Sequence, residues 1–173
     1  MRILYLLTIA ISNIVTARFS PITLIDGLLI FPAGSVFAGA AFVFRDFVQL
    51  KHGKAKTYAT IICAMAISAI VSISVGDTVH IVAASTVSFF VSETIDTEVF
   101  SKFRNSLIFR VLISGIAGSI VDSAMFVVLG LSPIGAGMLS WAEVPYAVCG
   151  QVVVKTIVQV LSVIFMKMKN VGD

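Results

Sequence analysis

The sequence predicts an all-α fold: an integral membrane bundle of six transmembrane helices, formed by residues 1–173 as one domain, with both termini in the cytoplasm. The first observation is the composition: 58% of the 173 residues are hydrophobic, only 12% are charged, and the mean hydropathy is +1.07. A soluble domain carries about 25% charged residues, so this chain could not cover its surface for water. The other two observations are the lengths of the apolar segments and the placing of the basic residues between them.

Six segments are long enough to cross a bilayer, since a spanning helix needs about 20 mostly apolar residues. Proline and glycine separate several of them, at Ser20-Pro21, Gly76-Asp77 and Ser132-Pro133, because these residues end helices for steric reasons. The first segment also resembles a signal peptide, but a polar Asn13 interrupts its apolar core, and we expect an uncleaved span. The expected spans are residues 2–20, 22–44, 57–76, 78–100, 106–131 and 141–166.

Lysine and arginine gather at alternate connections between these segments. The third and fifth connections contain neither residue, and the first contains only Arg18. An excess of lysine and arginine marks cytoplasmic loops, so this distribution places both termini in the cytoplasm, as does the even number of spans. The basic residues that flank the second and fourth connections and the outer ends of the first and last segments are Arg2, Arg45, Lys51, Lys54, Lys56, Lys102, Arg104, Lys167 and Lys169.

Ionisable residues also lie inside the apolar segments or at their edges. Such groups are expensive at bilayer depth, and chains keep them mainly where they bind something or relay charge. The sequence therefore predicts a bundle with a polar interior. It favours a carrier over a channel, because a pore lined by isolated charges of both signs is an unusual selectivity device. The ionisable residues inside or at the edges of the apolar segments are Asp26, Glu93, Asp96, Asp122, Glu143 and Lys155.

The fourth segment carries a polar stripe. Ser85, Ser88, Ser92 and Asp96 recur at spacings of three and four, so they share one face of a helix that should point into the bundle. For the serines we favour a structural role as hydrogen-bonding contacts between helices. For the neighbouring Glu93 we favour a functional role, because a carboxylate costs more than a hydroxyl in lipid.

The fifth and sixth segments carry similar stripes. Ser114, Gly118 and Asp122 lie four apart, and the small residues among them allow helices to approach closely. On the last segment, Lys155 is too deep to reach the interface easily and is expected to pair with Glu93 or Asp122, as a structural or a functional ion pair. It shares a stripe with two amides, Gln151 and Gln159.

Two further ion pairs are expected near the cytoplasmic edge. Arg110 should neutralise Asp96 across a short loop, and Glu98 should pair with Lys102 one helical turn away. The adjacent Arg45-Asp46 is interpreted as an interfacial anchor more than as a gate. Pro32 should bend the second helix, either as a simple kink or with carbonyl groups that face a cavity.

The remaining reactive residues give little sign of catalysis. Cys63 and Cys149 lie in apolar runs and are expected to be buried free thiols. His52 and His80 are predicted near opposite membrane faces and cannot easily share a site, so we expect no enzyme, no metal site and no cofactor. No GxxxxGK[ST] loop occurs, so the chain cannot drive transport by hydrolysing ATP itself.

A set of these residues resembles a known family. The pattern Ala84-Ser85, Phe89, Asp96, Val99-Phe100, Arg110, Ser114, Asp122 and Phe126 is similar to that of the bacterial queuosine precursor transporters, also called the vitamin uptake transporter family. Phe31-Pro32, Arg45-Asp46, Gly53 and Lys155 also fit, so the resemblance runs through most of the chain. It implies a protein of the bacterial inner membrane that imports a 7-deazaguanine, the 7-cyano or 7-aminomethyl precursor of queuosine, without an ATPase partner.

The residues can be matched to such a cargo. A guanine-type edge presents adjacent N–H donors that a carboxylate can accept together, and proteins read bases by edge bonds and stacking. Asp122 or Glu93 would supply the carboxylate, and the same two residues are the candidates for proton coupling, because burial disfavours the charged form. The expected binding residues are Asn13, Phe89, Glu93, Asp122, Phe126, Tyr146, Gln151 and Lys155, with Trp141 as a further stacking candidate.

Two alternatives stay open beside the lone carrier. The chain could be the substrate-binding subunit of an ATP-driven vitamin importer, although the small residues Ala10, Ser12 and Ala17 form only a thin docking stripe on the first segment. The other alternative, an intramembrane enzyme, would need a nucleophile–base pair or a set of metal ligands, and the sequence suggests neither. The expected partners are a small planar heterocycle and membrane lipid, with a homodimer left open and no nucleic acid.

Overall fold

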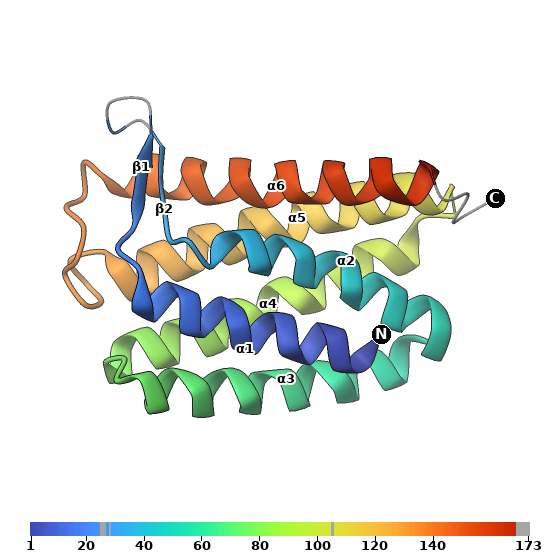
Figure 1. Cartoon of the computed structure of the whole chain (residues 1–173), viewed down its shortest axis with the longest axis horizontal. Coiled ribbons are helices and arrows are strands. Elements are labelled where there is room, and N and C mark those ends of the chain that lie inside the picture. Colours follow the sequence, from blue (N-terminus) through green and yellow to red (C-terminus); the bar gives the residue numbers. More distant parts are fainter. Residues whose placement is uncertain (25–26, 28, 105, 169–173) are drawn as a thin grey trace.

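The computed structural model describes residues 1–24, 27, 29–104 and 106–168. In this part of the chain six α-helices lie lengthwise in an elongated bundle (Figure 1). Two short antiparallel strands form a hairpin at one end, with Thr23 opposite Ile30. The helices are α1 (Arg2–Arg18), α2 (Ser35–His52), α3 (Lys54–Val75), α4 (Val79–Lys102), α5 (Leu107–Phe126) and α6 (Val144–Met168); α5 continues into a π-helical turn, η1 (Val127–Leu131), and the strands are β1 (Ile22–Leu24) and β2 (Leu29–Phe31).

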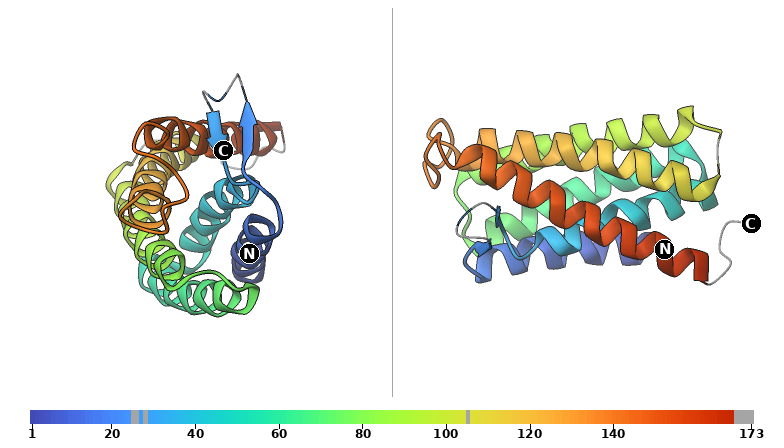
Figure 2. Two further views of the ribbon diagram at one scale, coloured as in Figure 1. Left: turned by 90° about the vertical axis from the view of Figure 1, so that its left-hand side faces the viewer. Right: turned by 90° about the horizontal axis from the view of Figure 1, so that it is seen from above.

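The helices form a ring around the bundle axis. Each contacts the next in the order α1, α2, α6, α5, α4 and α3, and α3 closes the ring against α1. Figure 2 shows this ring end-on, with α2 displaced toward its interior. Helix α2 also contacts α3, α4 and α5, so its side chains reach every other helix of the bundle.

The two ends of the bundle differ in charge. We call the end where α1 begins and α2 finishes the basic end, because Lys51, Lys54 and Lys102 lie there. Helix α6 finishes at this end too (Figure 1). The opposite end carries the hairpin and the turn between α3 and α4. In that turn Gly76 adopts a left-handed conformation (φ 90°), which a glycine reaches without strain, and Thr78 caps α4 by accepting a hydrogen bond from the Ile81 N–H.

Five of the six expected segments coincide with helices to within a few residues, but the second does not. The prediction of a helix over residues 22–44 is wrong, because the hairpin occupies its first part and α2 runs from Ser35 to His52. The expected bend at Pro32 is also wrong: this proline precedes the helix, and its carbonyl accepts a hydrogen bond from the Ser35 N–H. Asp26, another expected ionisable residue, lies outside the described residues.

Three helices are long and apolar enough to cross a membrane: Lys54–Val75, Leu107–Leu131 and Val144–Phe165, among the residues described. Helix α1 is slightly short, with 17 residues. Helices α2 and α4 contain charged residues that lower their hydropathy, among them Arg45, Glu93 and Asp96, each at most 1% exposed. Six membrane crossings therefore stay a prediction, while three helices have the length and composition that a crossing requires.

The bundle is polar inside and apolar outside. Charged and amide side chains such as Lys155, Gln151 and Gln159 are buried, whereas large apolar side chains such as Ile70 of α3 and Phe165 of α6 point outward, each more than 60% exposed. Water would not favour this distribution, but a lipid environment does. Cys63 and Cys149 are free thiols as expected, but both face outward, so the expectation that they are buried is wrong.

Small residues on α5 bring its neighbours close. Gly118 lies where α5 meets α2 and α4, and a Cβ atom added there would be 2.9 Å from Phe42 Cε1 and 3.0 Å from Asp96 Cβ. Gly115 is covered by the Gln159 amide of α6. The predicted stripe of small residues on this helix is thus confirmed as a helix-packing surface.

We expect Gly118→Ala to destabilise the protein by about 1–3 kcal/mol, because neither Phe42 nor the Asp96 stem can move aside without disturbing its neighbours. Thermal unfolding of the purified protein in detergent measures the effect as a lower Tm. Ala59→Val is the matched control, since Ala59 is exposed on α3 and extra volume there meets no protein atom of the core. Equal Tm values for the two variants would contradict the tight packing described here.

Candidate functional site

A cavity of about 100 Å³ lies inside the bundle, and all six helices contribute to its wall. One water molecule needs about 10–15 Å³ of such space, so the cavity is large enough for several water molecules. Its wall reaches from Asp77 and Thr16, close to the hairpin end, to Glu93 at the middle of α4. Among the residues that the structure describes, none at the basic end of the bundle belongs to this wall.

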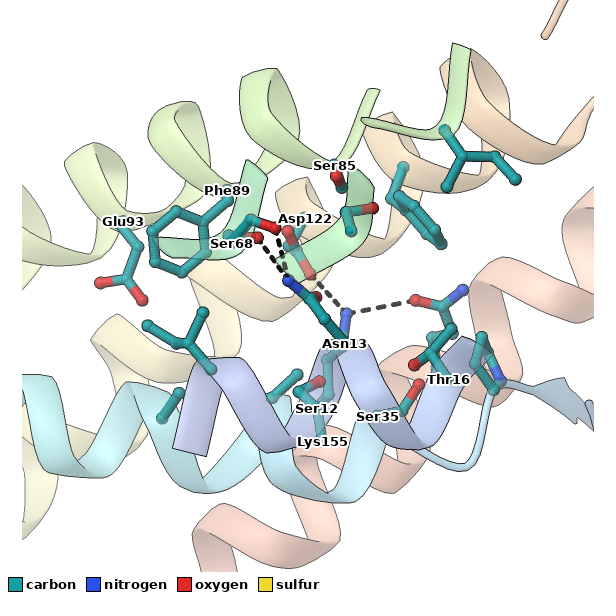
Figure 3. A pocket seen from close by; sticks show the side chains of 18 of the residues that line it. Ser12, Asn13, Thr16, Ser35, Ser68, Ser85, Phe89, Glu93, Asp122 and Lys155 are labelled. Atoms are coloured by element: carbon teal, nitrogen blue, oxygen red, sulfur yellow. Dashed lines mark hydrogen bonds and ion pairs between the residues drawn. The ribbon is translucent and has the colours of Figure 1, made fainter. Parts of the chain in front are cut away.

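The polar centre of the cavity is an ion pair between α5 and α6. Lys155 Nζ donates to Asp122 Oδ2 at 2.6 Å, to Ser123 Oγ at 2.9 Å and to Gln151 Oε1 at 3.2 Å. Lys155 is 2% exposed and Asp122 is 18% exposed. Of the two partners expected for Lys155, the structure confirms Asp122 (Figure 3).

One donor at this centre is left unused. The Gln151 Oε1 atom accepts from the ammonium of Lys155, which can only donate, so the amide N–H groups must point the other way. The Gln151 Nε2 atom is buried, has no hydrogen-bond partner within the described part of the chain, and belongs to a side chain in the cavity wall. An unsatisfied buried donor of this kind is costly, and it is ready to bond an acceptor on a bound molecule.

Helix α1 supplies the facing wall. Asn13 Nδ2 donates to the Ser68 hydroxyl at 2.7 Å and to the Ser68 carbonyl at 3.1 Å, which ties α1 to α3 beside the cavity (Figure 3). Ser12 donates to the Gly34 carbonyl at 2.8 Å, which ties the same helix to the start of α2. Both side chains lie in the cavity wall, so α1 is fixed by the hydrogen bonds that line the site.

The apolar part of the wall contains two of the predicted aromatic residues. Phe89 of α4 and Phe126 of α5 are half-buried and line the cavity. Two other aromatic candidates do not line it: Tyr146 and Trp141 are 44% and 54% exposed at the hairpin end. Their neighbour Glu143, just before α6, accepts hydrogen bonds from the Ser140 N–H and hydroxyl, which lower the pKa of its carboxyl group.

The cavity therefore brings together seven of the eight predicted binding residues and leaves out Tyr146. Sequence reasoning missed several hydroxyl residues of the wall, namely Ser12, Thr16, Ser35, Ser68 and Ser72, and the carboxylate of Asp77, which accepts a hydrogen bond from the Ser72 hydroxyl. The spacing of four between Ser68 and Ser72 was the available signal, since it places both on one face of α3.

A second cluster of charges lies next to the cavity. Arg45 is fully buried and forms ion pairs with Asp46 at 2.9 Å, with Glu93 at 3.2 Å and with Asp96. Its Nη1 atom also donates to Gln49 Oε1 at 2.8 Å. We call Arg45, Asp46, Glu93 and Asp96 the Arg45 cluster. The interpretation of Arg45-Asp46 as an interfacial anchor is wrong, because both side chains point into the bundle, where α2 meets α4.

Both boundary ion pairs expected from the sequence are wrong. Asp96 faces α2 and pairs with Arg45, whereas Arg110 donates from Nε to the Phe100 carbonyl at 3.0 Å and lies over the Phe100 ring. Glu98 faces α3 instead of the last turn of its own helix. It pairs with Lys54 at 2.7 Å and accepts a hydrogen bond from Tyr58 of α3, which leaves Lys102 outside the pair.

A helical bundle that exposes apolar side chains and encloses a polar cavity with a buried ion pair is typical of a membrane transport protein. Residues 71–168 match the family model described as "Putative vitamin uptake transporter", and the chain belongs to this family. The matched region contains α4, α5 and α6, which carry Glu93, Asp122 and Lys155. Neither a curated protein nor a solved structure matches the chain.

We expect Lys155→Met to destabilise the protein by about 3 kcal/mol, because it leaves Asp122 as an unpaired charge in the cavity wall. Asp122→Asn in the same chain should recover a large part of this loss, since the double variant contains no uncompensated charge. Thermal unfolding in detergent measures both. Lys54→Met is the control, because it breaks an exposed ion pair and should cost less than about 1 kcal/mol. Additive losses in the double variant would contradict the pairing.

Proposed function

We propose that this vitamin uptake transporter imports a 7-deazaguanine, the 7-cyano or 7-aminomethyl precursor of queuosine, across the bacterial inner membrane as a lone carrier. In this proposal all six helices cross the membrane and the basic end faces the cytoplasm, as the positive-inside rule favours. The observation that carries the proposal is the set of hydrogen-bonding groups at the cavity centre, where an unpaired amide donor and a carboxylate lie side by side.

These groups complement the edge of a guanine-type base. Such an edge presents a carbonyl oxygen beside N–H donors, and proteins read an isolated base by edge bonds together with stacking. The free Gln151 Nε2 donor suits the carbonyl oxygen. Asp122 Oδ1 suits an N–H donor, because its present contact is a long one of 3.5 Å from the Ser92 hydroxyl. Phe89 and Phe126 offer apolar surfaces in the same wall, which suits a flat ring.

The charge of the cavity wall fits a cargo that carries no strong negative charge. Lys155 is neutralised by Asp122, and Glu93 and Asp77 add further carboxylates to the wall. An anionic vitamin would meet these carboxylates without a free cation among the described wall residues. A neutral or aminomethyl-bearing deazaguanine meets no such repulsion.

We expect Gln151→Leu to weaken 7-deazaguanine binding by up to about tenfold, since one hydrogen bond contributes a net of about 0.5–1.5 kcal/mol. Calorimetry with the purified protein, run against the cyano and aminomethyl compounds, guanine and common vitamins, measures this loss. Gln159→Leu is the matched control: it lies two turns along α6, bonds Ser119 and the Gly115 carbonyl, and is absent from the cavity wall. Failure of the wild-type protein to prefer deazaguanines over the vitamins would refute the proposed cargo.

The purified chain alone, reconstituted in liposomes, should take up radiolabelled deazaguanine without ATP or any further protein. A lone carrier needs only its own cavity and an electrochemical or concentration gradient. Empty liposomes and an excess of unlabelled cargo give the background. Tight binding without uptake would overturn the carrier and indicate instead a substrate-binding subunit of an ATP-driven importer.

A further inference from the structure

The Arg45 cluster contains more negative than positive groups. Asp46, Glu93 and Asp96 all pair with the single guanidinium of Arg45, and all four side chains are at most 1% exposed. If all three carboxyl groups were ionised, the cluster would bury two uncompensated negative charges. Buried carboxyl groups without a partner cation take up a proton instead. The cluster therefore has to hold a proton unless another cation lies beside it.

The described parts of the surrounding helices supply too little positive charge to balance the cluster. The titratable and charged groups near the cluster are Tyr5 of α1, Tyr58 of α3, Arg110 and Asp122 of α5, and Lys155 of α6. Lys155 is engaged by Asp122, and Arg110 bonds the Phe100 carbonyl and ring. Even with Arg110 included, three carboxyl groups face two guanidinium groups. The described residues also contain no cluster of histidine, cysteine and acidic side chains that could hold a metal ion.

The contacts of the other carboxyl groups do not remove this deficit. Asp46 meets the Arg45 guanidinium and the neutral Ser114 hydroxyl, and the ion pair of Asp96 is with the same Arg45. The hydroxyl of Tyr5 is fully buried and interacts with the Glu93 carboxyl group. A protonated carboxyl group is itself a donor, so a proton on one carboxyl group can satisfy a neighbouring carboxylate or hydroxyl oxygen.

Glu93 connects this cluster to the cavity. Its carboxyl group pairs with Arg45, and the same side chain forms part of the cavity wall (Figure 3). Beyond the cluster, toward the basic end, Gln49 donates to the Thr97 carbonyl and to Ser101, so α2 and α4 are closed against each other there. The cluster thus lies between the cavity and the end of the bundle through which the cargo would have to leave.

We propose that the Arg45 cluster is the proton-binding site of the transporter, and that Glu93 links the bound proton to the cargo; this inference rests on the proposed function. The cluster takes up this proton from the cavity side before the cargo binds, and one of its carboxyl groups is then a carboxylic acid. Its release to the cytoplasm regenerates the carboxylate, whose repulsion from the neighbouring carboxylates loosens α2 from α4. Asp122 stands outside this cluster, since its ion pair is with Lys155.

The test uses the purified full-length chain in liposomes with an imposed pH gradient, acidic outside, and 7-aminomethyl-7-deazaguanine as cargo. The wild-type protein should take up cargo several-fold faster with the gradient than without it, and cargo addition should acidify the interior as reported by an entrapped dye. Glu93→Gln should lose both the acceleration and the acidification. Glu98→Gln is the matched control, because it removes an exposed carboxyl group from the same helix and should keep both.

A second measurement does not depend on transport, and its main result comes from the wild-type protein. Infrared spectra of the wild-type protein without cargo should contain the band of a protonated carboxylic acid at neutral pH, and Glu98→Gln should leave it unchanged. Absence of this band, uptake that ignores the pH gradient, or uptake that follows a sodium gradient instead would each overturn the proton site. Proton-independent uptake would leave the proposed cargo standing, whereas the band without any deazaguanine binding would refute the cargo and keep the buried proton.

Discussion

The compensation of buried charge by Arg45 is the constraint on which this structure depends. Its guanidinium group reaches across from α2 to two carboxyl groups of α4 and a third on its own helix, all within the bundle interior. A fork-shaped group with several donors suits several carboxyl groups at once, which an ammonium group would do less well. Arg45 thereby ties α2 to α4, and α2 in turn contacts every other helix.

The remaining polar interior follows the same rule of local compensation. The ammonium of Lys155 is surrounded by a carboxylate, a hydroxyl and an amide oxygen, and Gln159 bonds the backbone of α5 where Gly115 leaves it accessible. Close helix contacts at glycine allow these short side-chain bonds, since a larger residue would separate the helices. The Gln151 Nε2 donor departs from this rule, and its side chain lies in the cavity wall.

Helical period and hydropathy were sufficient to predict five helices, the inward faces of α4, α5 and α6, and the pairing of Lys155 with one of two acids. They could not predict the hairpin, because residues 22–31 are as apolar as a membrane-spanning segment. Only the backbone pairing of β1 with β2 distinguishes the hairpin from a helix, and hydropathy does not report that pairing. They also misassigned Asp96 and Glu98. Period places a side chain on a face of its helix, but the neighbour that this face meets depends on the packing of the whole bundle: Arg45 for Asp96 and Lys54 for Glu98.

The position of Glu93 on α4 explains why one residue can serve two sites. Phe89 precedes it by one turn and lines the cavity, while Asp96 follows by almost one turn and belongs to the Arg45 cluster. The stripe thus changes from cavity wall to charge cluster at Glu93, without a break in the helix. A cargo that draws the Glu93 carboxyl group toward the cavity would weaken its ion pair with Arg45. The ion pairs of Asp46 and Asp96 would change as well, because they share the Arg45 guanidinium. Coupling between cargo and proton then needs no long pathway, because a single side chain contacts both.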